Sequence, residues 1–310
     1  MLRIYLAFLL VGVFSGSNFI YIKWASPLLS SGQIVLLRVF FGFVPLAILA
    51  WRRSLIKLDQ IRHLHHFFVM AVTAMCFSYF ANAKGTVLIP SGSAGVLSGS
   101  VPLFASVASC LFLPKERMTR LMVVGVVIGI GSNVLIARPW SSSTVDSPVD
   151  PVGAAWVLSS SMVYGLAYVY ARKFISTKDT PALAIVTWQM GIALAILLCI
   201  TDTSGIGRIG QNWRAALGLS IGLGLLGTGM TFVLYYIVLE KLGAVTAAGA
   251  GYLVPAVALV VGWFAGEQIG TPELVAVGMT FCSVAMVEIG RRQSLRENAG
   301  TNPVPSVTLE

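Results

Sequence analysis

The 310-residue chain has few charged residues. Asp, Glu, Lys and Arg together make up 11% of it, against roughly 25% in soluble domains. Acidic residues are the scarcest, with 12 Asp and Glu against 21 Lys and Arg, while 56% of the chain is hydrophobic. Such a chain cannot cover a water-exposed surface. The composition therefore excludes a soluble enzyme, a secreted disulfide-rich scaffold and a disordered protein, and predicts a membrane protein with almost no soluble part.

Cysteine and catalytic motifs are also lacking. The four cysteines lie in four different apolar segments without metal or redox spacing, so we interpret them as small membrane-buried residues. The chain has no P-loop, no HExxH and no nucleophile elbow. His63, His65 and His66 fit a basic turn at the membrane surface better than a metal site. We therefore expect no enzyme activity, catalytic residue, cofactor or metal.

Long apolar runs replace the alternating pattern of a β-barrel, and they have the length of membrane-spanning helices. Because a charge at mid-bilayer is costly, charged residues mark the ends of the spans. Eight uncharged runs lie between Arg3 and Lys23, Arg62 and Lys84, Lys84 and Lys115, Arg120 and Arg138, Asp150 and Arg172, Asp179 and Asp202, Arg214 and Glu240, and Lys241 and Glu267. Residues 32–51, which contain Arg38, and 274–289 complete ten predicted helices. The first run could be read as a signal peptide, but it stays apolar to Ile22 and is long enough to span.

The distribution of positive charge predicts the orientation. With the N-terminus in the cytoplasm, 15 of the 21 Lys and Arg residues fall on the cytoplasmic side and 5 outside, and Arg38 lies in the membrane. The positive-inside rule then puts both termini in the cytoplasm. These cations are topology signals and contacts to membrane lipids, so no nucleic-acid partner is expected.

The two halves of the chain resemble each other. Ser78-Tyr79-Phe80, Ser93-Ala94, Val101-Pro102, Phe112 and Thr119 recur as Thr231-Phe232-Val233, Thr246-Ala247, Val254-Pro255, Phe264 and Thr271, at an offset of 153 residues through the prolines and 152 after them. Each half holds five helices, and an odd number inverts the second half relative to the first. The predicted all-α organisation is a first repeat at 1–140, a periplasmic linker at 141–150, an inverted second repeat at 151–291 and a disordered cytoplasmic tail at 292–310. Inverted repeats place a substrate site near the midplane and support alternating access, which indicates a transporter.

Polar and aromatic residues within the spans are the candidate substrate-binding residues. Pro102 and Pro255 remove helix hydrogen bonds and are expected to bend cavity-lining helices. The candidates that would contact a substrate are Asn18, Arg38, Tyr79, Asn82, Ser100, Tyr164, Tyr168, Trp188, Gln189, Tyr235 and Tyr252. Arg38 has two open interpretations, binding of a substrate carboxylate or a structural role. The deep aromatic residues suggest an amphipathic, aromatic solute.

No Asp or Glu lies in the middle of a predicted span. Proton-coupled exporters commonly titrate a buried carboxylate. The sequence therefore predicts facilitated export or exchange of a roughly neutral solute rather than proton antiport.

The chain resembles the drug/metabolite transporter superfamily, in its EamA family with two repeats of five helices. The resemblance covers residues 3 to about 291 and rests on residues 14–19 (FSGSNF), Arg38, Val101-Pro102 with the following 112–117 (FLPKER), and Val254-Pro255 with 264–267 (FAGE). It implies a central cavity between helices one to four and six to nine, with helices five and ten outside. Within the family the chain looks like the YddG-type exporters, which implies export of aromatic amino acids and related metabolites from the cytoplasm across a bacterial inner membrane. It departs from the smaller multidrug members, because its first helix has no membrane-embedded Glu.

Three other functions stay open at this point. A nucleotide-sugar or phosphorylated-metabolite exchanger would need several buried cations, and only Arg38 is present. A multidrug exporter and a non-transporting membrane scaffold are the others. The expected partners are a small-molecule substrate and membrane lipids. The oligomeric state is open, and a monomer fits the sequence.

Overall fold

A computed structural model describes residues 2–113, 118–138, 149–175 and 180–300, and all regular elements in these ranges are helical. Nine of these helices are long and apolar enough to cross a membrane, and a shorter apolar helix lies at Ala250–Phe264. The predicted ten-helix, all-α membrane fold is therefore confirmed.

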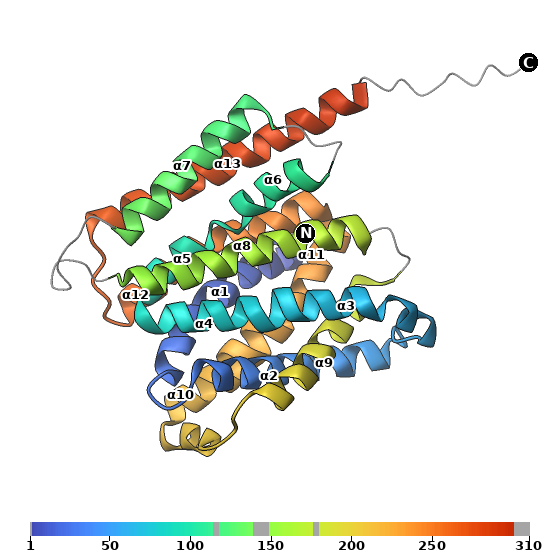
Figure 1. Cartoon of the computed structure of the whole chain (residues 1–310), viewed down its shortest axis with the longest axis vertical. Helices are drawn as coiled ribbons and strands as arrows, with labels where there is room; N and C mark the ends of the chain where they lie inside the picture. Colours follow the sequence, from blue (N-terminus) through green and yellow to red (C-terminus); the bar gives the residue numbers. More distant parts are fainter. Residues whose placement is uncertain (1, 114–117, 139–148, 176–179, 301–310) are drawn as a thin grey trace, which may run out of the picture.

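The helices lie roughly side by side along one direction (Figure 1). In chain order the spans are α1 (Leu2–Ala25); α2 (Ser31–Arg52); α3 (Leu64–Met70), η2 (Ala71–Phe77) and α4 (Ser78–Leu88); α5 (Ser91–Ser98) and α6 (Val101–Phe112); α7 (Arg120–Ala137); α8 (Pro151–Phe174); α9 (Ala182–Ile200); α10 (Trp213–Leu217), η4 (Gly218–Met230) and α11 (Thr231–Gly249); η5 (Ala250–Tyr252) and α12 (Leu253–Phe264); and α13 (Thr271–Gly300). Short 3-10 turns, η1 (Leu58–His63) and η3 (Ile206–Gln211), connect the spans at their ends.

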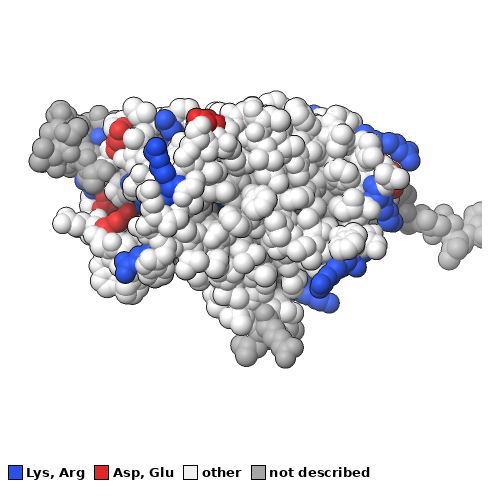
Figure 2. All heavy atoms as spheres, turned by 90° about the horizontal axis from the view of Figure 1, so that it is seen from below, with Lys and Arg blue, Asp and Glu red and all other residues white. Residues whose placement is uncertain are grey.

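Charged side chains gather at the two ends of this helix stack. Figure 2 shows Lys, Arg, Asp and Glu at both ends, with a broad uncharged band between them on this face. Apolar side chains within the spans are exposed as well: Leu9, Val44, Val127 and Leu198 are each more than 40% exposed. Contact between such an apolar surface and lipid costs no free energy, whereas its exposure to water would be unfavourable.

Local sequence signals begin several helices. The Ser30 side chain accepts a hydrogen bond from the Gln33 N–H (3.3 Å), and the Gln33 side chain accepts one from the Ser30 N–H (3.1 Å), which is a capping box at the start of α2. Asp150 caps α8 and Thr119 caps α7 in the simpler single-bond form.

Glycines in η4 allow two other spans to approach it closely. A Cβ on Gly222 would lie 2.6 Å from the Tyr21 ring of α1, and one on Gly229 would lie 2.6 Å from Pro45 of α2. Small residues at helix contacts permit backbone approach in membranes. The glycine-rich sequence of this span is therefore explained by packing on two sides.

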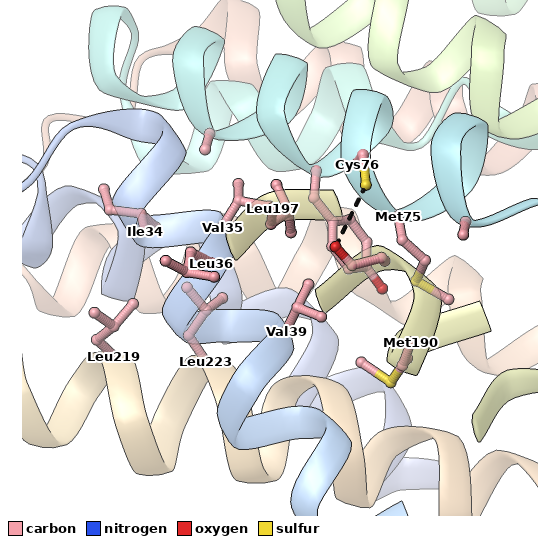
Figure 3. Packing of buried hydrophobic residues seen from close by; sticks show 14 of the residues in the cluster. Ile34, Val35, Leu36, Val39, Met75, Cys76, Met190, Leu197, Leu219 and Leu223 are labelled. Atoms are coloured by element: carbon pink, nitrogen blue, oxygen red, sulfur yellow. Dashed lines mark hydrogen bonds between the residues drawn. The ribbon is translucent and has the colours of Figure 1, made fainter. Parts of the chain in front are cut away.

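The largest cluster of buried apolar residues joins α2 to the third, seventh and eighth spans. Ile34, Val35 and Val39 of α2 lie between Met190 and Leu197 of α9 and the η4 residues beneath them (Figure 3). Met75 and Cys76 of η2 close the cluster on the opposite side of α9. Close packing at this point fixes the face of α2 that carries Arg38.

Helices α7 and α13 pack against each other at one edge of the molecule (Figure 1). The Ser283 hydroxyl donates to the Gly125 carbonyl (2.6 Å), and the Ser132 hydroxyl donates to the Ala276 carbonyl (2.7 Å). Gly125 therefore serves the α7–α13 contact within this chain.

The helices of the fourth and ninth spans are interrupted close to Pro102 and Pro255, the two prolines that were expected to bend them. Helix α5 ends at Ser98 and α6 begins at Val101, one residue before Pro102. In the ninth span the 3-10 turn η5 precedes α12, whose third residue is Pro255. Since proline cannot donate to the preceding turn, both interruptions follow from the sequence.

The third and eighth spans each contain a π-helical segment stabilised by a side-chain hydroxyl. Ser78 Oγ donates to the carbonyl of Thr73 (2.8 Å), and Thr231 Oγ1 donates to the carbonyl of Leu226 (2.9 Å). Each acceptor lies five residues before its donor, as π-helical geometry requires. The two bonds are 153 residues apart, the offset found between the two halves of the sequence.

One boundary differs from the prediction. Disorder was expected from residue 292, but α13 continues as a helix to Gly300. The physical reason is that no proline or glycine interrupts the chain between Arg291 and Gly300. The predicted linker at 141–150 lies mostly, and residues 301–310 of the tail lie wholly, outside the described residues.

Candidate substrate site

Arg38 is a buried cation in the second turn of α2, only 8% exposed. Its Nε donates a hydrogen bond to Thr228 Oγ1 of η4 (3.0 Å). Its guanidinium carbon lies 3.7 Å from the centroid of the Tyr79 ring of α4. Among the described residues no carboxylate forms an ion pair with it. Arg38 is therefore held by a hydroxyl and an aromatic face, although a guanidinium has five N–H donors.

Two tyrosines, Tyr79 and Tyr164, lie beside this cation, and two further tyrosines lie next to them. Tyr164 and Tyr168 of α8 meet edge to face, with ring centroids 5.1 Å apart. Tyr164 lies near Tyr79 and Arg38, and Tyr168 lies near Tyr235 of α11. Tyr168 is 50% exposed, although tyrosines of the third and eighth spans lie near it. Five of the predicted residues, Arg38, Tyr79, Tyr164, Tyr168 and Tyr235, thus come together; we call them, with Thr228, the Arg38 cluster.

Asn18 lies beside this cluster. Its Nδ2 donates to the carbonyl of Gly227 (3.2 Å), the residue before Thr228, and its buried Oδ1 has no hydrogen-bond partner. A buried amide oxygen without a partner is costly unless water or a ligand fills the gap. Asn18 therefore joins α1 to η4 beside the cluster, with its Oδ1 against Gly227.

The other predicted residues make separate contacts. Asn82 donates to Ser98 Oγ (3.1 Å), which joins α4 to α5, and Ser100 donates to Asn133 of α7 (2.8 Å). Ser100 thus points toward the fifth span and is not brought to the Arg38 cluster. Gln189 is buried in α9, and Tyr252 lies half-buried in η5.

Trp188 is attached to a surface turn. Its Nε1 donates to Gln60 Oε1 (2.8 Å), and Gln60 also accepts from the Lys57 N–H (3.3 Å) and donates to the Leu55 carbonyl (2.8 Å). The indole therefore ties α9 to the connection between the second and third spans.

The comparison with known families decides the identity. The model of the EamA-like transporter family matches residues 2–138 and again 151–289. The chain belongs to the EamA-like transporter family. It is an integral membrane protein, and as a transporter it has a small-molecule substrate.

Individual relatives of this EamA-like transporter are distant. It is 27% identical over 263 residues to "Uncharacterized transporter YoaV" of Bacillus subtilis, covering 84% of this chain and 86% of that protein. It is 27% identical to "Probable terminal-alkyne amino-acid exporter" of Streptantibioticus cattleyicolor, covering 71% of this chain and 70% of that protein. A solved crystal structure shares the fold, with a TM-score of 0.61 at 16% identity, over 93% of this chain and 98% of the other.

At one end of the EamA-like transporter, side chains of the second half bind elements of the first. The Glu267 carboxylate accepts hydrogen bonds from the N–H groups of Ser91 (2.7 Å) and Gly92 (3.0 Å) at the start of α5. Arg138, which follows α7, forms a 2.9 Å salt bridge with Glu273 of α13. These contacts hold the two halves together on that side of the membrane.

Sequence reasoning missed Thr228 and Tyr236. Thr228 is a hydroxyl between two glycines of η4, and this placement was the available signal. Tyr236 is half-buried, and its ring centroid lies 6.0 Å from that of Tyr235. The adjacent pair of tyrosines in one span was the signal for this residue.

Proposed function

We propose that this EamA-like transporter exports neutral and aromatic amino acids across a bacterial inner membrane, with Arg38 binding the substrate carboxylate. The observation that carries the proposal is a buried guanidinium that has no carboxylate partner among the described residues. A cation at such depth is costly unless it is paired. The carboxylate of an amino acid would supply the missing anion in a bidentate geometry.

The tyrosines of the Arg38 cluster support an aromatic or amphipathic side chain in the substrate. They offer ring faces for stacking and hydroxyl groups for the substrate ammonium. The printed name of the Streptantibioticus cattleyicolor relative, an amino-acid exporter, supports the same substrate class.

Alternating access is supported by a pattern of matched helix contacts. α1 packs against the eighth and ninth spans, as α8 packs against the third and fourth. The π-helical segments at an offset of 153 residues belong to the same pattern. Two inverted repeats that exchange conformations would open the site to each side in turn.

We further propose that protons do not drive transport and that both termini lie in the cytoplasm. No carboxylate belongs to the Arg38 cluster as the described residues define it. A carboxylate in the membrane is the usual group for proton coupling.

The experiment is uptake into proteoliposomes of labelled phenylalanine, tryptophan, threonine, glutamate and a nucleotide sugar, with and without a pH gradient. Saturable uptake of the neutral amino acids that does not depend on the gradient is expected. Uptake driven by the gradient would overturn the uncoupled mechanism, and preference for the anions would overturn the substrate class.

The role of Arg38 is tested by Arg38→Gln, with Arg214→Gln as the matched control, because Arg214 is an exposed cation at the start of the eighth span. Loss of a charge-assisted contact is worth about 1.5–3 kcal/mol. The KM for phenylalanine should rise roughly 10- to 100-fold in Arg38→Gln. Inhibition by a phenylalanine analogue that lacks the carboxylate should not change; an equal loss for both compounds would assign Arg38 a structural role.

A further inference from the structure

A groove opens between the start of α2, the η2–α4 segment and the end of α9. Its volume is about 590 Å³. No residue of the Arg38 cluster lines it, so it is separate from the candidate substrate site.

The walls of the groove are apolar and follow two helices that cross the membrane. Val72, Phe77 and Phe80 line it from the third span, and Ile196 and Ile200 line it from α9. The lining of the third span extends from Val72 to Lys84, which is at most about 18 Å at the α-helical rise of 1.5 Å per residue. Half of a bilayer core is about 15 Å thick. The groove therefore has the depth of one leaflet and suits an acyl chain rather than a compact solute.

The mouth of the groove carries two opposite charges. Lys84, in the last turn of α4, and Asp202, just after α9, both line it and are both exposed. The start of α2, at Ser31 and Gly32, lies at the same mouth. The mouth thus carries one exposed cation, Lys84, and one exposed carboxylate, Asp202, and the start of α2 lies beside the Asp202 turn.

Hydrogen bonds hold Asp202 in place. Gln33 Nε2 of α2 donates to the carbonyls of Asp202 (2.9 Å) and Ser204 (3.0 Å). The Ser204 N–H donates to Asp202 Oδ1 (2.8 Å), and the hydrogen bonds from Ser204 hold the pKa of Asp202 below its usual value. Asp202 is therefore a carboxylate at neutral pH in a turn that is attached to α2.

We propose that this groove binds one acyl chain of a phospholipid whose headgroup carries both a phosphate and a primary ammonium, as phosphatidylethanolamine does. Lys84 binds the phosphate, and Asp202 accepts a hydrogen bond from the ammonium. The charge pattern of the mouth selects this headgroup. Phosphatidylglycerol offers no cation to Asp202, and the trimethylated ammonium of phosphatidylcholine has no N–H to donate.

The test is native mass spectrometry of the full chain purified from mixed micelles that contain equal amounts of phosphatidylethanolamine, phosphatidylcholine and phosphatidylglycerol. Exposed charge pairs contribute about 0.2–1 kcal/mol. Retention of phosphatidylethanolamine should therefore exceed that of phosphatidylcholine roughly 1.4- to fivefold. Asp202→Asn should remove this preference, and Lys84→Gln should lower the retention of all three lipids.

Arg208→Gln and Asp59→Asn are the matched controls, because both residues are exposed in connecting turns and neither lines the groove. They should retain the wild-type lipid pattern, and thermal unfolding should show that all four variants are folded. Equal retention of the three lipids by the wild type would overturn the proposal. So would a preference that survives in Asp202→Asn, or displacement of the bound lipid by labelled phenylalanine, which would make the groove a substrate path.

Discussion

The guanidinium carbon of Arg38 lies 3.7 Å from the centroid of the Tyr79 ring, so a buried cation on α2 rests on an aromatic face from α4. A desolvated cation–π contact is worth about 2 kcal/mol. The aromatic ring supplies this energy through its face.

Tyr79→Phe should therefore keep most of the stability, whereas Tyr79→Leu should lose about 2 kcal/mol. Thermal unfolding in detergent measures both. Tyr79→Phe should also keep transport, since Arg38 stays in place, with a loss limited to the share of the Tyr79 hydroxyl in binding the substrate ammonium. If both substitutions destabilise the protein equally, the aromatic face is not what supports Arg38.

The hydrogen bond between Trp188 and Gln60 gives a different expectation for the indole. Trp188→Phe keeps an aromatic ring but removes the donor, and Gln60 Oε1 retains its bond from the Lys57 N–H. The loss should be about 0.5–1.5 kcal/mol, typical of one hydrogen bond whose acceptor keeps another partner. Gln60→Leu in the Trp188→Phe background should then cost less than Gln60→Leu alone, which a double-mutant cycle of unfolding measures. Full additivity would mean that the two side chains do not interact.

Gly227 of η4 contacts Asn18 of α1 so closely that even one added methyl group should force the two helices apart. A Cβ on Gly227 would collide with Asn18 Oδ1, whereas one on Gly278 of α13 would meet nothing within 4 Å. Gly227→Ala should destabilise by about 1–3 kcal/mol, as overpacking does, and Gly278→Ala should have little effect. Asn18→Ala should partly restore the stability of Gly227→Ala. Equal melting temperatures for the two glycine variants would contradict the close packing.

The orientation can be tested by labelling new cysteines in intact cells. Gly207 lies in η3, between the seventh and eighth spans, and Asp59 lies in η1, between the second and third. A reagent that cannot cross the membrane should label Gly207→Cys in intact cells, but should label Asp59→Cys only after lysis. Labelling of the wild type in parallel measures the background from the four native cysteines. The reverse pattern would place both termini outside.

Local chemistry in the sequence was enough to find the spans. Because charge is excluded from the bilayer core, Arg120 and Arg138 bracketed the fifth span, and α7 runs from Arg120 to Ala137. The interruptions near Pro102 and Pro255 were predictable for the same kind of reason, since the missing N–H of proline acts within its own helix. The π-helical segments of the third and eighth spans had no comparable signal.

The candidate site was predictable in part. Arg38, Tyr79 and the tyrosines of α8 were identified as polar or aromatic residues deep in a span, and the structure brings them together. The hydrogen-bond partner of Arg38 was not predictable, because Thr228 lies 190 positions further along the chain.

The sequence by itself determined that the chain crosses the membrane ten times, because hydrophobicity and charge are properties of each segment alone. Only the tertiary structure decided that Ser100 bonds to Asn133, that Trp188 bonds to Gln60 and that Arg38 lies on Tyr79. The physical reason is that each of these contacts depends on which faces of two helices meet. Packing of glycines, hydroxyls and apolar side chains among ten helices fixes those faces, and residues distant in the chain contribute to it together.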